Sequence, residues 1–135
     1  MKPLFSNTLV TLLLLTGPFA TTAAADCGRQ HAPPFISGGI GEDERLDMRV
    51  VACNYNLRLV FAQAGSGAYL AAVRVRIEDA TTHARLINTV AKGPFFYASL
   101  PPGSYDVRVR YRGQVQERNF VIRDGNTRTS HFYWP

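Results

Sequence analysis

A tight corner between two apolar patterns constrains the fold of this chain most strongly. Residues 93–112 read GPFFYASLPPGSYDVRVRYR. In the second half of this stretch, valines and tyrosines alternate strictly with Asp or Arg, so one face of a strand is core and the other is solvent. Pro101 and Pro102 cannot donate to a strand ladder, and Gly103 tolerates the backbone angles of a turn. Residues 100–104 are therefore predicted to form a corner between two strands.

Period-two patterns separated by turn residues cover the rest of the chain from Leu57 onward. Before the corner, strands are predicted over residues 57–62, 69–78, 85–91 and 95–100. After it, strands are predicted over residues 104–112, 115–122 and 127–134. Short strands at a spacing of roughly ten residues, with no helical period between them, are typical of an antiparallel sandwich. We therefore predict an all-β fold, a seven-stranded antiparallel β-sandwich over residues 57–135.

The first residues have the order of a secretory signal. Lys2 precedes a mostly apolar run over residues 4–15, and three alanines end at Ala25 before Asp26. Residues 1–25 are therefore predicted to be a signal peptide that is cleaved after Ala25, and we expect no membrane span after cleavage. A retained anchor is the less favoured alternative, because a spanning helix needs about 20 apolar residues. The remainder, residues 26–135, has the length of one domain.

Two cysteines, Cys27 and Cys53, occur in the chain, and both follow the predicted signal. In an oxidising compartment such a pair most simply forms one disulfide. Closing this loop would contribute about 3 to 4 kcal/mol in the chain-entropy model. A redox or metal-binding pair is less favoured, because the close Cys-x-x-Cys spacing and neighbouring histidine ligands are missing.

Residues 26–56 are predicted to form a linker and a short helix. Residues 29–37 contain two prolines and no periodicity, which indicates an extended surface linker. A helix is predicted after Gly41, where three acidic residues favour the positive end of a helix dipole. Its apolar stripe, predicted to be buried, consists of Leu46, Val50 and Cys53. The same acidic residues would repel a phosphate group at the preceding glycines.

Three consecutive aromatic residues cannot all lie in the sandwich core, so another element must pack on those that face outward. They are Phe95, Phe96 and Tyr97, and period two must send them to both faces of the sheet. We expect the N-terminal helix to cover the outward ones. Otherwise, an exposed aromatic beside an open edge strand would indicate a partner surface, through strand addition or self-association.

Three motifs in the strand region carry a resemblance to a known family. They are Tyr-Leu-Ala-x-Val-x-Val at 69–75, Gly-Pro-Phe at 93–95 and Leu-Pro-Pro-Gly-x-Tyr at 100–105. These motifs resemble the carboxypeptidase regulatory-like domains, which are transthyretin-like or prealbumin-like sandwiches. The stretch 37–44 is similar to what precedes such a domain in small exported proteins of Gram-negative bacteria. Over about residues 37–122, the resemblance implies a seven-stranded prealbumin-like sandwich that acts as an accessory or binding module, in the periplasm or secreted, without catalytic residues.

Arginine supplies the candidate binding site, since 13 of the 15 basic residues are arginines. The candidates lie on the predicted outer faces of two strands: Arg74, Arg76, Arg108, Arg110 and Arg112. Guanidinium groups bind carboxylates and phosphates with two parallel hydrogen bonds, so this face is suited to a protein or an anionic envelope polymer. Arg118 and Arg128 would join it if the strands pair favourably. The alternative is a solvated face, partly neutralised by Glu78, Asp106 and Glu117.

Other partners and chemistries are not expected. Nucleic acid is disfavoured, because export removes the usual partner and no aromatic residue is interleaved with the arginines of residues 108–112. No metal site is predicted, since the histidines are His31, His83 and His131, which lie far apart in the chain. His83 with Asp79 and Glu78 could approach such a site, but a solvated turn is favoured. We expect no cofactor.

The sequence does not predict an enzyme. Ser66, between two glycines, lacks the strand-turn-helix setting of a nucleophile elbow. The transthyretin-like hydroxyisourate hydrolases end in Tyr-Arg-Gly-Ser, whereas this chain ends in His-Phe-Tyr-Trp-Pro. A hydrolase of that type remains an alternative that depends on fold analogy alone. A structural homodimer, paired along an edge strand, is a further alternative.

Overall fold

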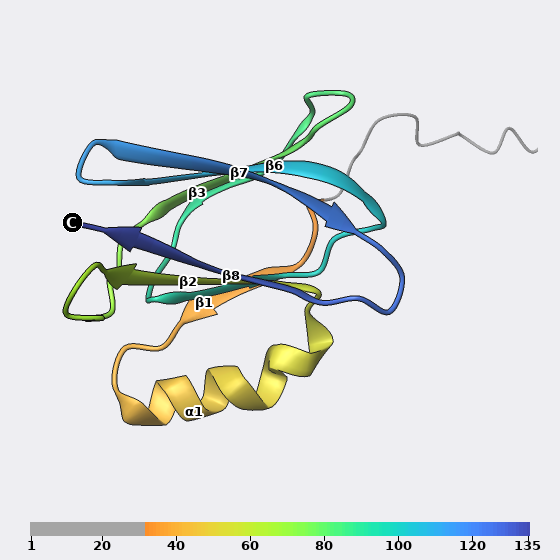
Figure 1. Cartoon of the computed structure of the whole chain (residues 1–135). Coiled ribbons are helices and arrows are strands. Elements are labelled where there is room, and N and C mark those ends of the chain that lie inside the picture. Colours follow the sequence, from red (N-terminus) through yellow and green to blue (C-terminus); the bar gives the residue numbers. More distant parts are fainter. Residues whose placement is uncertain (1–31) are drawn as a thin grey trace, which may run out of the picture.

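A computed structural model describes residues 32–135, which form two four-stranded sheets packed face to face (Figure 1). One sheet, here sheet A, has the order β1-β5-β2-β8, and the other, sheet B, has the order β4-β3-β6-β7. The elements are β1 (Phe35–Gly38), α1 (Glu42–Val51), the 3-10 helix η1 (Ala52–Asn54), β2 (Leu57–Gln63), β3 (Arg74–Asp79), β4 (Arg85–Val90), β5 (Phe95–Ala98), β6 (Gly103–Tyr111), β7 (Gln114–Ile122) and β8 (Arg128–Trp134).

The predicted β-sandwich is confirmed, with eight strands in place of seven. The additional strand is β1, in a stretch predicted as a linker, which pairs antiparallel with β5 from Phe35 to Gly38. The predicted signal peptide and Cys27 lie outside the described residues. Among residues 32–135, no helix combines the length and hydropathy that crossing a membrane requires.

Sheet A is mixed, which corrects the prediction of a wholly antiparallel sandwich. Strand β8 pairs parallel with β2 over seven residues, from Leu57 opposite Arg128 to Gln63 opposite Trp134. The preceding strand, β7, belongs to sheet B, so the turn after it carries the chain from one sheet to the other. A hairpin fixes antiparallel pairing, whereas a crossover between sheets leaves the direction free.

The second predicted strand, over residues 69–78, is shorter than expected. Tyr69 forms an isolated bridge with Ala62 of sheet A, and the ladder of sheet B begins only at Arg74. Between them, Ala72 adopts a positive φ of 58° and donates its N–H to Ala91 O at 3.0 Å. The pattern was therefore correct for the buried positions, but the chain changes sheets inside it.

The core between the sheets follows the predicted alternation. Val107 and Val109 of β6 are fully buried, whereas Arg108 and Arg110 are exposed on the outer face. The inward side chains of β2 and β8 include Phe61, Phe132 and Trp134, whose rings pack against one another. Burial of these large apolar side chains is the main source of stability.

Helix α1 covers the outer face of sheet A, as Figure 1 shows. Phe96 points into the core, while Phe95 and Tyr97 form a second apolar cluster with Met48 of α1. The expected cover for the consecutive aromatic residues is thus confirmed. Burial raises the pKa of Tyr97 above its usual value.

The predicted buried stripe of α1 is wrong. Leu46 is 50% exposed, Val50 is 76% exposed, and Cys53 of η1 is also exposed. Met48 is the buried side chain of α1, and Ala52 packs beside it. The few apolar residues of α1 lie on two different sides of this short helix, and contact with Phe95 and Tyr97 selects the side that contains Met48.

Candidate anion-binding face

Five arginines converge on the outer surface of sheet B, and we call this surface the arginine face. Its members are Arg74, Arg76, Arg85, Arg108 and Arg110. The pairing of β3 with β6 sets Arg74 directly opposite Arg110 and Arg76 directly opposite Arg108. With Asn88 and Val115, they line an open concavity of about 410 Å³. Four of the five predicted binding residues are therefore brought together.

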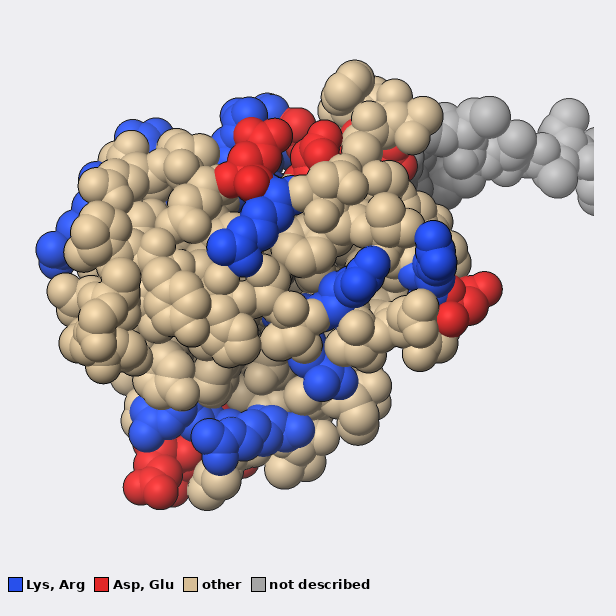
Figure 2. All heavy atoms as spheres, viewed as in Figure 1, with Lys and Arg blue, Asp and Glu red and all other residues tan. Residues whose placement is uncertain are grey.

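Basic and acidic side chains both lie over sheet B on the side seen in Figure 2. Basic side chains gather at the upper left, acidic ones lie beside them at the top, and further basic ones cross the middle of the view. The first turn of α1, which covers the opposite sheet, contains Glu42, Asp43 and Glu44. Some basic side chains over sheet B therefore have acidic neighbours, and others are left to attract an anion.

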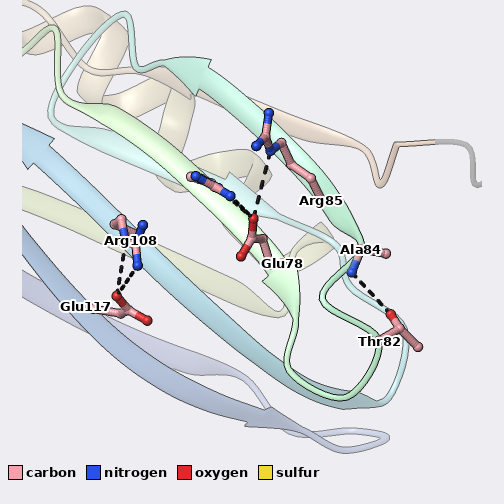
Figure 3. A network of polar contacts seen from close by, with 7 residues as sticks. Glu78, Thr82, Ala84, Arg85, Arg108 and Glu117 are labelled. Carbon is pink, nitrogen blue, oxygen red and sulfur yellow. Dashed lines mark hydrogen bonds and ion pairs between the residues drawn. The ribbon is translucent and has the colours of Figure 1, made fainter.

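Three arginines of the arginine face have carboxylate neighbours (Figure 3). Glu78 accepts a hydrogen bond from Arg76 Nε at 2.6 Å, and its Oε1 lies 3.9 Å from Arg85 Nε. Glu117 Oε2 accepts hydrogen bonds from Arg108 Nε at 3.0 Å and Nη2 at 2.8 Å. The hydrogen bond to Glu117 raises the pKa of Arg108.

Arg74 and Arg110 differ from these three, since neither forms an ion pair within the described residues. Directly opposite residues of an antiparallel pair have Cα atoms about 4.5 to 5.5 Å apart. Like charges in such positions destabilise the sheet, and an anion between them would remove that repulsion. The geometry therefore suits a ligand that carries carboxylate or phosphate groups.

Arg112 was predicted to belong to this face, and the structure places it elsewhere. It lies in the turn between β6 and β7 with a positive φ of 46°, and its guanidinium carbon is 5.2 Å from the centre of the Tyr111 ring. It does not line the concavity. The alternation of inward and outward side chains in β6 ends at this turn. Alternation therefore does not predict the direction of the Arg112 side chain.

Arg118 and Arg128 also lie away from the arginine face. Arg118 Nη1 donates to Ser130 Oγ and to His131 O, and its guanidinium carbon lies 4.2 Å from the centre of the Phe132 ring. Arg128 Nε donates to Val121 O at 3.2 Å. Both side chains therefore connect β7 to β8, where the two sheets meet at one edge.

Two residues of the concavity, Arg85 and Asn88 of β4, were missed by the sequence analysis. Ile87 pairs with Ile77, but the next pair is Arg85 with Glu78, so the register shifts by one residue. A bulge of this kind re-aims side chains, and period-two counting along β4 alone does not reveal it. Asn88 lies in the regular register opposite Arg76, so alternation from the buried Ile87 would have placed it on the outer face, whereas Arg85 depends on the bulge.

Asp79 and Ser66, which were considered for metal binding and catalysis, have structural partners, while His31 lies outside the described residues. Asp79 accepts hydrogen bonds from the backbone N–H groups of Thr82 and Thr81, which lowers its pKa. Ser66 Oγ donates to Gln63 Oε1 at 3.2 Å within a turn. Residues 32–135 contain no group of three or more His, Cys, Asp or Glu side chains that could hold a metal ion.

Comparison with known proteins gives a limited result. No protein-family model matches the chain. No curated protein matches it. Among solved structures, the chain is similar to 5-hydroxyisourate hydrolase of Klebsiella pneumoniae, with 16% sequence identity and a TM-score of 0.46 over 58% of this chain and 87% of that chain. A likeness at this level assigns neither a family nor an activity, and the sandwich architecture follows from the strand pairing itself.

Proposed function

We propose that this protein is a non-catalytic binding module of the periplasm or the extracellular space. Its arginine face binds an anionic partner, either a protein or an envelope polymer that carries carboxylate or phosphate groups. The observation that carries the proposal is the pair Arg74 and Arg110, which are exposed, directly opposite and without an ion-pair partner among the described residues.

The shape and lining of the concavity support binding rather than catalysis. Its lining consists of arginines, Asn88 and Val115, none of which is a nucleophile with a positioned base. It is open to solvent along sheet B, so an extended ligand with repeated charges fits it better than an enclosed small molecule. Guanidinium groups hold such charges bidentately, and the interaction is screened by salt.

Removal of the two unpaired charges tests this function. We expect the double variant Arg74→Gln/Arg110→Gln to bind polyglutamate or polyphosphate about 5- to 30-fold more weakly, because two ion pairs at exposed sites are lost and each contributes roughly 0.5 to 1 kcal/mol. Fluorescence anisotropy with labelled polymers measures the Kd, at low and at high salt. The two polymers distinguish carboxylate from phosphate as the preferred group.

A control variant with the same loss of charge is Arg49→Gln/Arg123→Gln. Arg49 lies on α1 and Arg123 follows β7, so neither lines the arginine face. This variant should change the Kd by less than about twofold, as expected for weakly interacting exposed charges. Equal weakening by both double variants would show attraction to net charge alone and would contradict the proposal.

We also propose that Cys53 is bonded to Cys27 in the exported protein. Cys53 is exposed and lines an open depression that Ser99 also lines. Ser99 N donates to Pro34 O at 2.9 Å, so the chain that leads back toward Cys27 passes this same depression. The seven residue-to-residue steps from Cys27 to Pro34 span about 23 Å when extended, which is ample length for the bond.

The thiol content of the protein tests this disulfide. Alkylation of protein recovered from the periplasm or medium, followed by mass spectrometry, should label neither cysteine before reduction and both afterwards. The Cys27→Ser variant should expose Cys53 to the reagent without any reductant. Labelling of Cys53 in the unreduced wild-type protein would refute the bond.

A further inference from the structure

Strand β4 leaves one of its sides unpaired. It is an edge of sheet B, next to β3. Ala91 N donates to Val73 O at 2.8 Å, and the register continues with Thr89 opposite Val75. Because the backbone groups of a strand alternate sides, Thr89 points its N–H and C=O toward β3, whereas Asn88 and Val90 point theirs away from the sheet. These outward groups are available to another strand.

The other edges of the two sheets are protected within the described residues. Side chains of β7 occupy backbone groups of β8: Gln116 Nε2 donates to Tyr133 O at 2.7 Å, and Arg118 Nη1 donates to His131 O at 2.9 Å. Trp134 Nε1 of β8 donates in return to Gln114 O. Strand β1 has four residues and follows two prolines. Short length, proline and covered backbone are the usual protections of edge strands.

Strand β4 has its bulge before Ile87, and residues 87–90 have none of these three protections. The strand also borders the arginine face. Its sequence, RLINTV, has no proline or lysine and contains strand-favouring Ile, Thr and Val. Arg85 and Asn88 of β4 line the concavity beside Arg74 and Arg76. A strand added to β4 would therefore place every second side chain on the outer surface, beside the outward residues of β4 and one strand further from Arg74 and Arg76 of β3.

We propose that β4 accepts an extended acidic segment of a partner protein as an added strand. This inference rests on the proposed anion-binding function and identifies the partner as a peptide. Residues that exchange hydrogen bonds with Asn88 and Val90 carry their side chains on the outer face, where an Asp or Glu faces the basic surface formed by Arg85 and, across Asn88 and Val90, by Arg76 and Arg74. The residues between them lie beside Ile87 and Thr89 and are apolar or small.

Electrostatic repulsion disfavours a second copy of this chain as the added strand. Two copies paired through β4 would join two arginine faces in one continuous sheet. The arginines of both copies would then lie on one continuous surface, and the repulsion between these like charges opposes the pairing. An acidic segment brings the opposite charge to the same positions, so it is favoured by both the backbone and the side chains.

Two peptides with the same amino-acid composition but different residue order test the inference. A labelled peptide in which Glu alternates with Val should bind at least 10-fold more tightly than a peptide with the same residues in two separate blocks. The Asn88→Pro variant removes the outward N–H without removing a bond to β3, and proline is tolerated on that side of an edge strand. It should weaken binding of the alternating peptide at least 10-fold relative to the matched control Asn88→Ala, which loses the same amide side chain but retains the N–H.

Hydrogen exchange provides a second measurement that needs no variant. The alternating peptide should slow exchange of the Asn88 and Val90 amides in the wild-type protein, and polyglutamate should not. If Asn88→Pro and wild type bind the peptide equally and the amides stay unprotected, the inference is wrong, whereas polymer binding that depends on Arg74 and Arg110 would still uphold the proposed function. If the protein instead forms a dimer that Asn88→Pro dissociates, a second copy is the occupant and the inference is also overturned.

Discussion

Replacement of Phe61 by alanine is expected to lower the free energy of unfolding by about 3 to 5 kcal/mol. Phe61 is fully buried on β2, which lies between β5 and β8 in sheet A. Its ring centre lies 6.2 Å from that of Phe132 and 6.1 Å from that of Trp134. Truncation removes the apolar side chain and leaves a cavity that two rigid rings fill poorly. Denaturant unfolding followed by circular dichroism measures the change.

A valine on the surface provides the control for this variant. Val121 of β7 is 38% exposed, and Val121→Ala should change the free energy of unfolding by less than about 0.5 kcal/mol. If Phe61→Ala costs less than about 1 kcal/mol, the aromatic side chains of β2 and β8 do not share a close-packed core.

Replacement of Asn56 by alanine is expected to cost about 2 to 4 kcal/mol. The Asn56 side chain holds both backbone groups of Leu100: Oδ1 accepts from Leu100 N at 2.8 Å, and Nδ2 donates to Leu100 O at 2.7 Å. Leu100 is 3% exposed and precedes the Pro101-Pro102 corner, where no neighbouring strand supplies other partners. Each buried polar group left without a partner costs about 1 to 3 kcal/mol.

The variants Asn126→Ala and Asn56→Asp separate this bond from general effects. Asn126 is exposed in the turn before β8, so its replacement should change stability by less than about 0.5 kcal/mol. Asn56→Asp retains an acceptor and loses the donor, but a protonated carboxyl again supplies an O–H. Relative to wild type, its deficit should therefore shrink as the pH falls, as thermal unfolding at several pH values would show. A deficit that does not change with pH would contradict the assigned bonds.

Part of the candidate site could be predicted from the sequence alone. The alternation of β3 and β6 predicted Arg74, Arg76, Arg108 and Arg110 on one exposed surface, and their pairing across the two strands makes it one site. Arg112 lies outside this surface, because the turn after Tyr111 ends the strand period. Pairing also decided which arginines remain without a carboxylate, since it brings Glu117 to Arg108.

The sequence by itself determined the inward and outward sides of the strands and the corner at Pro101 and Pro102, because side-chain alternation and proline geometry are local properties. Only the tertiary structure decided the parallel pairing of β8 with β2, the strand at Phe35–Gly38, the face of α1 that packs on Tyr97, and the entry of Arg85 into the arginine face. These features depend on contacts between segments far apart in the chain. Periodicity within one segment carries no information about which segment lies beside it.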